Sequence, residues 1–164
     1  MALTPQEVID LVVALEKDLV EFYDDLPLRK ALKPLKRICR FMSQQSAIHA
    51  QMIANHRSNA AIPQLRLDPL TTLHERLKTT LHKELAATDD VDQAAIRLSQ
   101  SEEVLAMAYA RIAEHFANVA DVYQTIAGKF NTLADDERSH RDYILREKAH
   151  LQKGACASSP DSAK

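Results

Sequence analysis

The residues of this 164-residue chain with the clearest chemical potential are carboxylates and histidines at helical spacing. Glu137 and His140 form a Glu-x-x-His step, and side chains three residues apart lie on the same face of a helix. His49 repeats this step earlier in the chain, with Ser46 in the place of the glutamate. Carboxylates and histidines that converge inside a helical bundle hold pairs of iron or manganese ions. The residue types therefore predict metal binding, with a ligand set that is one carboxylate short at Ser46.

Two further glutamates, Glu16 and Glu102, are predicted to point into the core. The residues at three, four and seven positions from Glu16 are all apolar or aromatic, and those around Glu102 are apolar or aromatic apart from Ser99. A buried carboxylate without a partner is costly or takes up a proton, and a bound cation is one remedy. Each glutamate also precedes a tyrosine by seven residues, Glu16 before Tyr23 and Glu102 before Tyr109.

Helical periodicity and a low glycine content predict an all-α fold. The chain contains only two glycines, which leaves little material for turns with positive φ. Thr4, Pro5 and Glu7 form a helix start, with a threonine cap, proline at the first helical position and glutamate at the third. Apolar spacing predicts a helix over about 5–26 and a second helix from just after Pro34 to about residue 57. Further helices are predicted over about 68–88, 91–116 and 122–151, with a loop at 59–67.

An internal repeat predicts how these helices are arranged. A glutamate seven residues before a tyrosine is followed by a helix bearing a histidine, and this order occurs twice. The first copy comprises Glu16, Tyr23, Ser46 and His49, and the second comprises Glu102, Tyr109, Glu137 and His140. Two similar helix pairs, joined by a crossover that carries the short extra helix, would build one four-helix bundle over residues 1–152. Residues 153–164 are small and polar and are predicted to form a disordered tail.

The order and spacing of these residues resemble the ferritin-like superfamily and, within it, the rubrerythrins. The resemblance covers roughly residues 5–150 and implies a ferritin-like bundle with a di-iron centre. The ligands that it implies are Glu16 and His49 for one metal, Glu102 and His140 for the other, and Glu137 as a bridge. Tyr23, Tyr109 and Ser46 would lie next to these ligands. Iron is the expected metal, with manganese and zinc as alternatives.

The chain departs from the rubrerythrin pattern at two ligand positions. Ser46 stands where a bridging glutamate is expected, and Leu105 stands where rubrerythrins carry a further glutamate. Three states of the site follow. Two ions remain, with water, oxide or an anion beside Ser46; one ion is held by Glu102, Glu137 and His140; or the carboxylates are held by hydrogen bonds alone.

The resemblance implies an oxidoreductase that reacts with oxygen or peroxide, and two other functions remain open. One is iron binding or sequestration without turnover, and the other is a metal-free helical scaffold. With only two cysteines, the paired cysteine knuckles of a rubredoxin module are not expected. Any reduction would therefore need a separate electron donor.

A basic face is the other feature that indicates a partner. No aspartate or glutamate occurs between Leu26 and Leu67, whereas six cations occur between Arg29 and Arg40. This face is interpreted either as a docking site for an acidic electron donor or an anion, or as an ordinary solvated surface. Nucleic acid is disfavoured because no aromatic residues interleave with the cations.

The remaining features place few constraints on function. The net charge of −2 gives no general attraction to nucleic acid or membrane, and no apolar run approaches the length of a membrane span. The N-terminus does not resemble a signal peptide, so a cytoplasmic protein is expected. The family resemblance suggests a homodimer. His74 and His82, two turns apart on the short helix, form a candidate accessory metal site.

Overall fold

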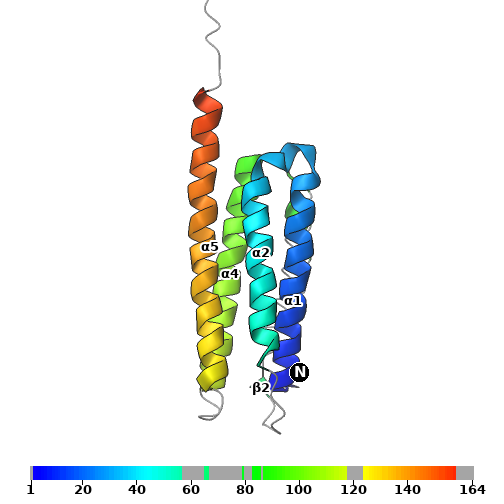
Figure 1. The fold of residues 1–164 in the computed structure, drawn as a ribbon, viewed down its shortest axis with the longest axis vertical. Helices are drawn as coiled ribbons and strands as arrows, with labels where there is room; N and C mark the ends of the chain where they lie inside the picture. The colour runs from blue at the N-terminus through cyan, green and yellow to red at the C-terminus, as the bar shows by residue number, and fades with distance from the viewer. Residues whose placement is uncertain are drawn as a thin grey trace, which may run out of the picture.

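Four long helices lie side by side along the longest axis of the molecule (Figure 1). The computed structural model describes residues 2–56, 65–66, 79, 83–85, 87–117 and 124–157. The four helices are α1 (Pro5–Asp25), α2 (Lys36–Ala54), α4 (Val91–Ala117) and α5 (Gln124–Ala157). Two short 3-10 helices, η1 (Leu26–Leu28) and η2 (Lys30–Leu35), connect α1 to α2. The all-α class predicted from the sequence is confirmed.

The start of α1 follows the predicted capping pattern. The Thr4 hydroxyl accepts the Glu7 N–H at 3.2 Å, and the Glu7 carboxylate accepts the Thr4 N–H at 2.6 Å. This reciprocal capping box satisfies backbone donors that the first turn would leave unpaired. At the other end, α1 gives way to η1, which contains Pro27 and continues the chain toward α2.

The direction of the helices decides which residues meet. In Figure 1 the chain ascends through α1, descends through α2 and α4, and ascends again through α5. Helices α1 and α2 pack against each other, as do α4 and α5. Helices α1 and α4 are therefore antiparallel. A later residue of one helix lies level, along the bundle axis, with an earlier residue of the other.

One apolar cluster joins the four helices. Buried side chains from α1, α2, α4 and α5 contribute to it, together with Leu32 and Leu35 from η2. The rings of Phe116 and Phe130 stack with centroids 5.6 Å apart, which ties α4 to α5. The carboxylates and histidines buried within this core are those that the sequence predicted as ligands, and their burial is costly unless they are paired or bind a cation.

Several boundaries differ from the sequence-based expectations. Helix α5 ends at Ala157, beyond the expected end at Leu151, and the Gln152 side chain in this extension donates to the Asp92 carboxylate of α4 at 2.6 Å. Residues 65–66 (β2) pair antiparallel with residues 2–3 (β1), where a loop was expected. Residues 83–85 are helical, as predicted.

Parts of the chain that carry other predictions lie outside the described residues. These are most of the short helix expected over 68–88, including His74 and His82, and the last residues of the expected tail, 158–164. Among the helices that the structure does describe, none combines the length and apolar character needed to cross a membrane.

Candidate metal centre

Five titratable side chains from the four long helices meet in the core. Each is almost fully buried, with an exposed fraction of 4% or less. They are Glu16 from α1, His49 from α2, Glu102 from α4, and Glu137 and His140 from α5. All five were predicted as ligands from the sequence, and the structure brings them into one cluster.

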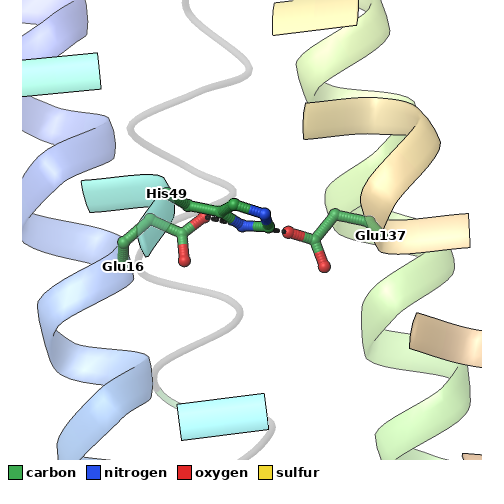
Figure 2. Close-up of side chains that lie close together, drawn as sticks. All are labelled: Glu16, His49 and Glu137. Atoms are coloured by element: carbon green, nitrogen blue, oxygen red, sulfur yellow. Dashed lines mark ion pairs between the residues drawn. The ribbon is translucent and has the colours of Figure 1, made fainter. Parts of the chain in front are cut away.

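Glu137 is the centre of this cluster because its two carboxylate oxygens face different histidines. Its Oε1 lies 3.0 Å from His49 Nδ1, which points from α2 toward the carboxylate (Figure 2). Its Oε2 lies 3.0 Å from His140 Nδ1 on α5 itself. A carboxylate placed in this way can contribute one oxygen to each of two neighbouring cation positions.

The cluster divides into two ligand groups that share Glu137. One group is formed by Glu16, His49 and Glu137, and the other by Glu102, Glu137 and His140. In each group the ligand atoms lie within 4.8 Å of one another. The rings of His49 and His140 stack with centroids 5.4 Å apart and an interplanar angle of 22°, so the two groups lie next to each other. Two carboxylates and one imidazole per group are a donor set suited to iron or manganese.

Two tyrosines hold the outer glutamates from the opposite helix. The Tyr109 hydroxyl on α4 donates to Glu16 Oε1 on α1, and the Tyr23 hydroxyl on α1 donates to Glu102 Oε1 on α4. The antiparallel course of α1 and α4 explains this exchange, because each tyrosine lies seven residues beyond its own helix's glutamate. The two hydrogen bonds fix the orientation of both outer carboxylates.

The second oxygen of each outer glutamate has no hydrogen-bond partner among the described residues. Glu16 Oε2 and Glu102 Oε2 are both buried and both accept nothing. An unsatisfied buried polar atom costs about 1–3 kcal/mol, and more when the group is charged. These two oxygens are therefore the observation in the structure that best supports cation binding at this centre.

His49 also lies close to possible partners without forming a hydrogen bond to a described residue. Neither ring nitrogen makes a hydrogen bond with acceptable geometry to a described residue, although both lie close to carboxylates. Nδ1 faces Glu137 and, at 3.7 Å, Glu16 Oε1 (Figure 2), whereas Nε2 lies 3.4 Å from Asp136 Oδ2. A carboxylate on the far side of a metal-binding histidine orients the ring and selects its tautomer.

Asp136 was not predicted from the sequence. It is partly exposed and lies beside the buried stripe of α5 rather than on it, so helical periodicity gives no reason to select it. The one available signal was its position immediately before Glu137. Its proximity to His49 comes from how α2 and α5 pack.

Burial dominates the electrostatics of the two outer glutamates. It raises the pKa of Glu16, and it raises the pKa of Glu102 well above the usual range, where the nearby charge of Glu137 adds to the effect. Without a cation, burial therefore favours the protonated form of Glu102. The same burial raises the pKa of the Tyr23 and Tyr109 hydroxyls, which remain protonated donors.

The pKa values of Glu137 and His49 shift in the directions that favour an ion pair between them. Burial alone would raise the pKa of Glu137, but the neighbouring Glu102, His140 and His49 side chains outweigh this effect and lower that pKa below its usual range. Burial likewise opposes the charge on His49, but the facing carboxylates of Glu137 and Glu16 raise its pKa to about 10. The metal-free centre thus holds a proton on His49 that a metal ion would displace.

Ser46 leaves α2 without a carboxylate in the centre. It is buried one turn before His49, and its hydroxyl offers neither the charge nor the reach of a glutamate. Leu105, at the other departure from the rubrerythrin pattern, is a buried apolar side chain of the core. Glu137 is consequently the sole carboxylate shared by the two ligand groups found among the described residues.

The structure gives the predicted basic face two different roles. Arg29 donates to the carbonyl oxygens of Leu85 and Thr88 and pairs with Asp89 at 2.7 Å, so it fixes the segment that precedes α4. Lys36 and Arg40 remain on the surface of α2.

No protein-family model, curated protein or solved structure matches the chain significantly. The function must therefore be inferred from the residues of the centre and their geometry.

Proposed function

We propose that this protein is a ferritin-like protein of rubrerythrin type that binds iron at its carboxylate/histidine centre and reacts with oxygen or peroxide. The observation that carries the proposal is the placement of Glu137 between His49 and His140. On each side, at Glu16 and Glu102, a buried carboxylate oxygen accepts no hydrogen bond from a described residue. The two-by-two helix arrangement and the repeated ligand order support the ferritin-like assignment.

The donor atoms favour iron or manganese over metals that prefer sulfur. Both groups consist of carboxylate oxygens and imidazole nitrogen, and the buried Cys39 does not belong to either. Bound iron would supply the one-electron chemistry that oxygen and peroxide require. The chain would hold the ligands in place through Tyr23 and Tyr109 and would keep bulk water out of the centre by burial.

Iron binding without turnover is the second candidate, and Ser46 favours it. A serine on α2 removes one of the two carboxylates that would tie a pair of ions together. Peroxide consumption by the iron-loaded protein with a chemical reductant separates the two functions. Repeated turnover supports an oxidoreductase, and uptake of iron without turnover supports a binding protein.

The direct test is whether iron binds and stabilises the fold. We expect anaerobic titration with Fe(II) to saturate at one or two ions per chain and to raise the melting temperature. A ligand that binds only the folded state stabilises it by about 2.7 kcal/mol at a free concentration of 100 times its Kd. Chelation should reverse the gain. A chain that takes up no iron would be a metal-free scaffold if its melting temperature also stays the same with added iron and with added chelator.

Metal binding should also depend on pH, with affinity for Fe(II) rising between pH 6 and pH 8. In the metal-free protein the pKa of His49 is about 10 and those of Glu16 and Glu102 are raised, so an incoming ion must displace protons. These raised values stabilise the metal-free fold most at low pH, and that contribution falls as the pH rises. The stabilisation by iron should therefore be larger at pH 8 than at pH 6.

Calorimetry in buffers of different ionisation enthalpy measures the proton release directly. The expected result is a net release of protons at pH 7. Binding that is independent of pH over this range would mean that the metal ion does not displace the proton from His49.

A further inference from the structure

A groove lies at the start of α2, on the side that faces α5. Its volume is about 720 Å³, and its walls include the cations Lys36, Arg37 and Arg40. The aromatic rings of Phe41 and Tyr143 form part of the same lining. The groove thus combines a basic rim with an aromatic floor.

The rim cations are largely available to a partner. Arg37 Nε lies 3.6 Å from Glu147, but the arginine side chain remains 79% exposed. Lys36 and Arg40 are exposed and pair with no carboxylate in the part of the chain that the structure describes. This local positive charge occurs in a chain whose net charge is −2.

The aromatic floor reaches the candidate metal centre. The Phe41 ring packs on Tyr143 with centroids 4.4 Å apart. It also meets the His140 ring edge-on, with centroids 5.5 Å apart and an interplanar angle of 88°. One aromatic side chain therefore separates the groove from an imidazole of the centre.

We propose that this groove docks the acidic face of a one-electron carrier protein, which reduces the metal centre through Phe41 and His140. The destination of the electron rests on the iron-binding function proposed above, whereas docking itself does not. With iron bound at the centre, one electron would pass from the reduced carrier to a ferric ion, giving the oxidised carrier and a ferrous ion, and no covalent bond would form or break.

The composition of the groove fits a protein better than nucleic acid or a single anion. Arginine and aromatic side chains are enriched at protein interfaces, and complementary charge steers the association of the partners. The volume of the groove greatly exceeds that of one phosphate group. The three rim cations cluster at one end of α2 and do not form a track along the molecule.

Docking can be measured on the metal-free protein with a small acidic [2Fe–2S] ferredoxin as the probe. We expect binding at low ionic strength, with NMR shift changes centred on Lys36, Arg40 and Phe41, and marked weakening at 0.2 M salt. Arg40→Glu and Lys36→Glu should each weaken binding by about tenfold, mainly through slower association. Arg111→Glu, an exposed arginine on α4, is the matched control and should leave binding unchanged.

Absence of binding at low salt, or equal losses from Arg40→Glu and Arg111→Glu, would overturn the docking site. Tighter binding of a single-stranded DNA oligonucleotide than of ferredoxin would also overturn it. Because this assay needs no iron, its result is independent of whether the chain binds metal.

The electron route needs a second variant. Phe41→Leu should preserve the Kd for ferredoxin and slow the reduction of the iron-loaded centre several-fold, measured by stopped-flow spectroscopy. An unchanged reduction rate would exclude Phe41 as the route. The metal titration described above detects failure of the proposed function separately.

Discussion

Replacing Glu137 by glutamine is expected to weaken the binding of iron at both ligand groups by more than about 100-fold. Loss of a hydrogen-bond partner behind a metal ligand typically costs 10–100-fold in affinity, and loss of a shared ligand should cost more. Glu137 is the only residue common to both groups of the described centre, and each of its oxygens faces one histidine at 3.0 Å. No other single substitution should affect both positions so strongly.

The variant should also be less stable without metal. A buried carboxylate with no partner could be removed without cost, but Glu137 carries the charge that compensates protonated His49. Removing one member of a buried ion pair leaves the other uncompensated and is strongly destabilising. The loss should be smaller at pH 8 than at pH 6, because without Glu137 the pKa of His49 falls and less of the ring is protonated at the higher pH.

Asp135→Asn is the matched control for this experiment. It makes the same acid-to-amide change two positions away on α5, but Asp135 is exposed and pairs with Arg138 at 2.7 Å. Anaerobic Fe(II) titration, with circular dichroism to check the helical content, should separate the two variants clearly. An affinity equal to wild type in a folded Glu137→Gln protein would contradict the role of Glu137 as the shared ligand.

The burial of Glu16 and Glu102 could be predicted from the sequence because it is a local property of each helix. Every neighbour of Glu16 at helical spacing is apolar or aromatic, so the face that carries it must be buried. The tyrosine pairing could not be predicted in the same way. Tyr23 and Tyr109 each bond the glutamate of the other helix, and this exchange requires the antiparallel course of α1 and α4.

Features that depend on contacts between helices were missed or placed differently. Asp136 approaches His49 only through the packing of α5 on α2, and its own periodicity is that of a surface residue. Arg29 belonged to the predicted basic face, but the carbonyl groups before α4 hold it. Helix α5 likewise extends past its expected end, and in this extension Gln152 contacts Asp92 of α4.

Replacing Ser46 by glutamate is expected to raise the iron content of the centre from about one ion per chain to two. The reason is charge. With Glu16, Glu102 and Glu137 all ionised, three negative charges face the four positive charges of two ferrous ions, which leaves one buried positive charge uncompensated. A single ferrous ion is balanced by Glu137 and one outer glutamate. Uncompensated buried charge is costly, so the wild-type centre should hold one ion tightly and a second weakly.

The new carboxylate would remove this imbalance. Position 46 is buried one turn before His49 on α2, so a glutamate there lies on the same helix face as an existing ligand. Four carboxylates then balance two ferrous ions. Without metal, the same variant should be less stable than wild type, because it adds a carboxylate to a site where burial already raises the pKa of two others.

Ser46→Gln separates the effect of charge from that of bulk. It introduces a side chain of the same length and shape as glutamate, but it carries no negative charge and cannot balance a second ion. Elemental analysis of protein purified without chelator should therefore give about one ion for wild type and Ser46→Gln, and two for Ser46→Glu. Two ions in wild type or in the glutamine variant would show that water, oxide or an external anion supplies the missing charge. The lack of a carboxylate at position 46 would then not limit the number of ions bound.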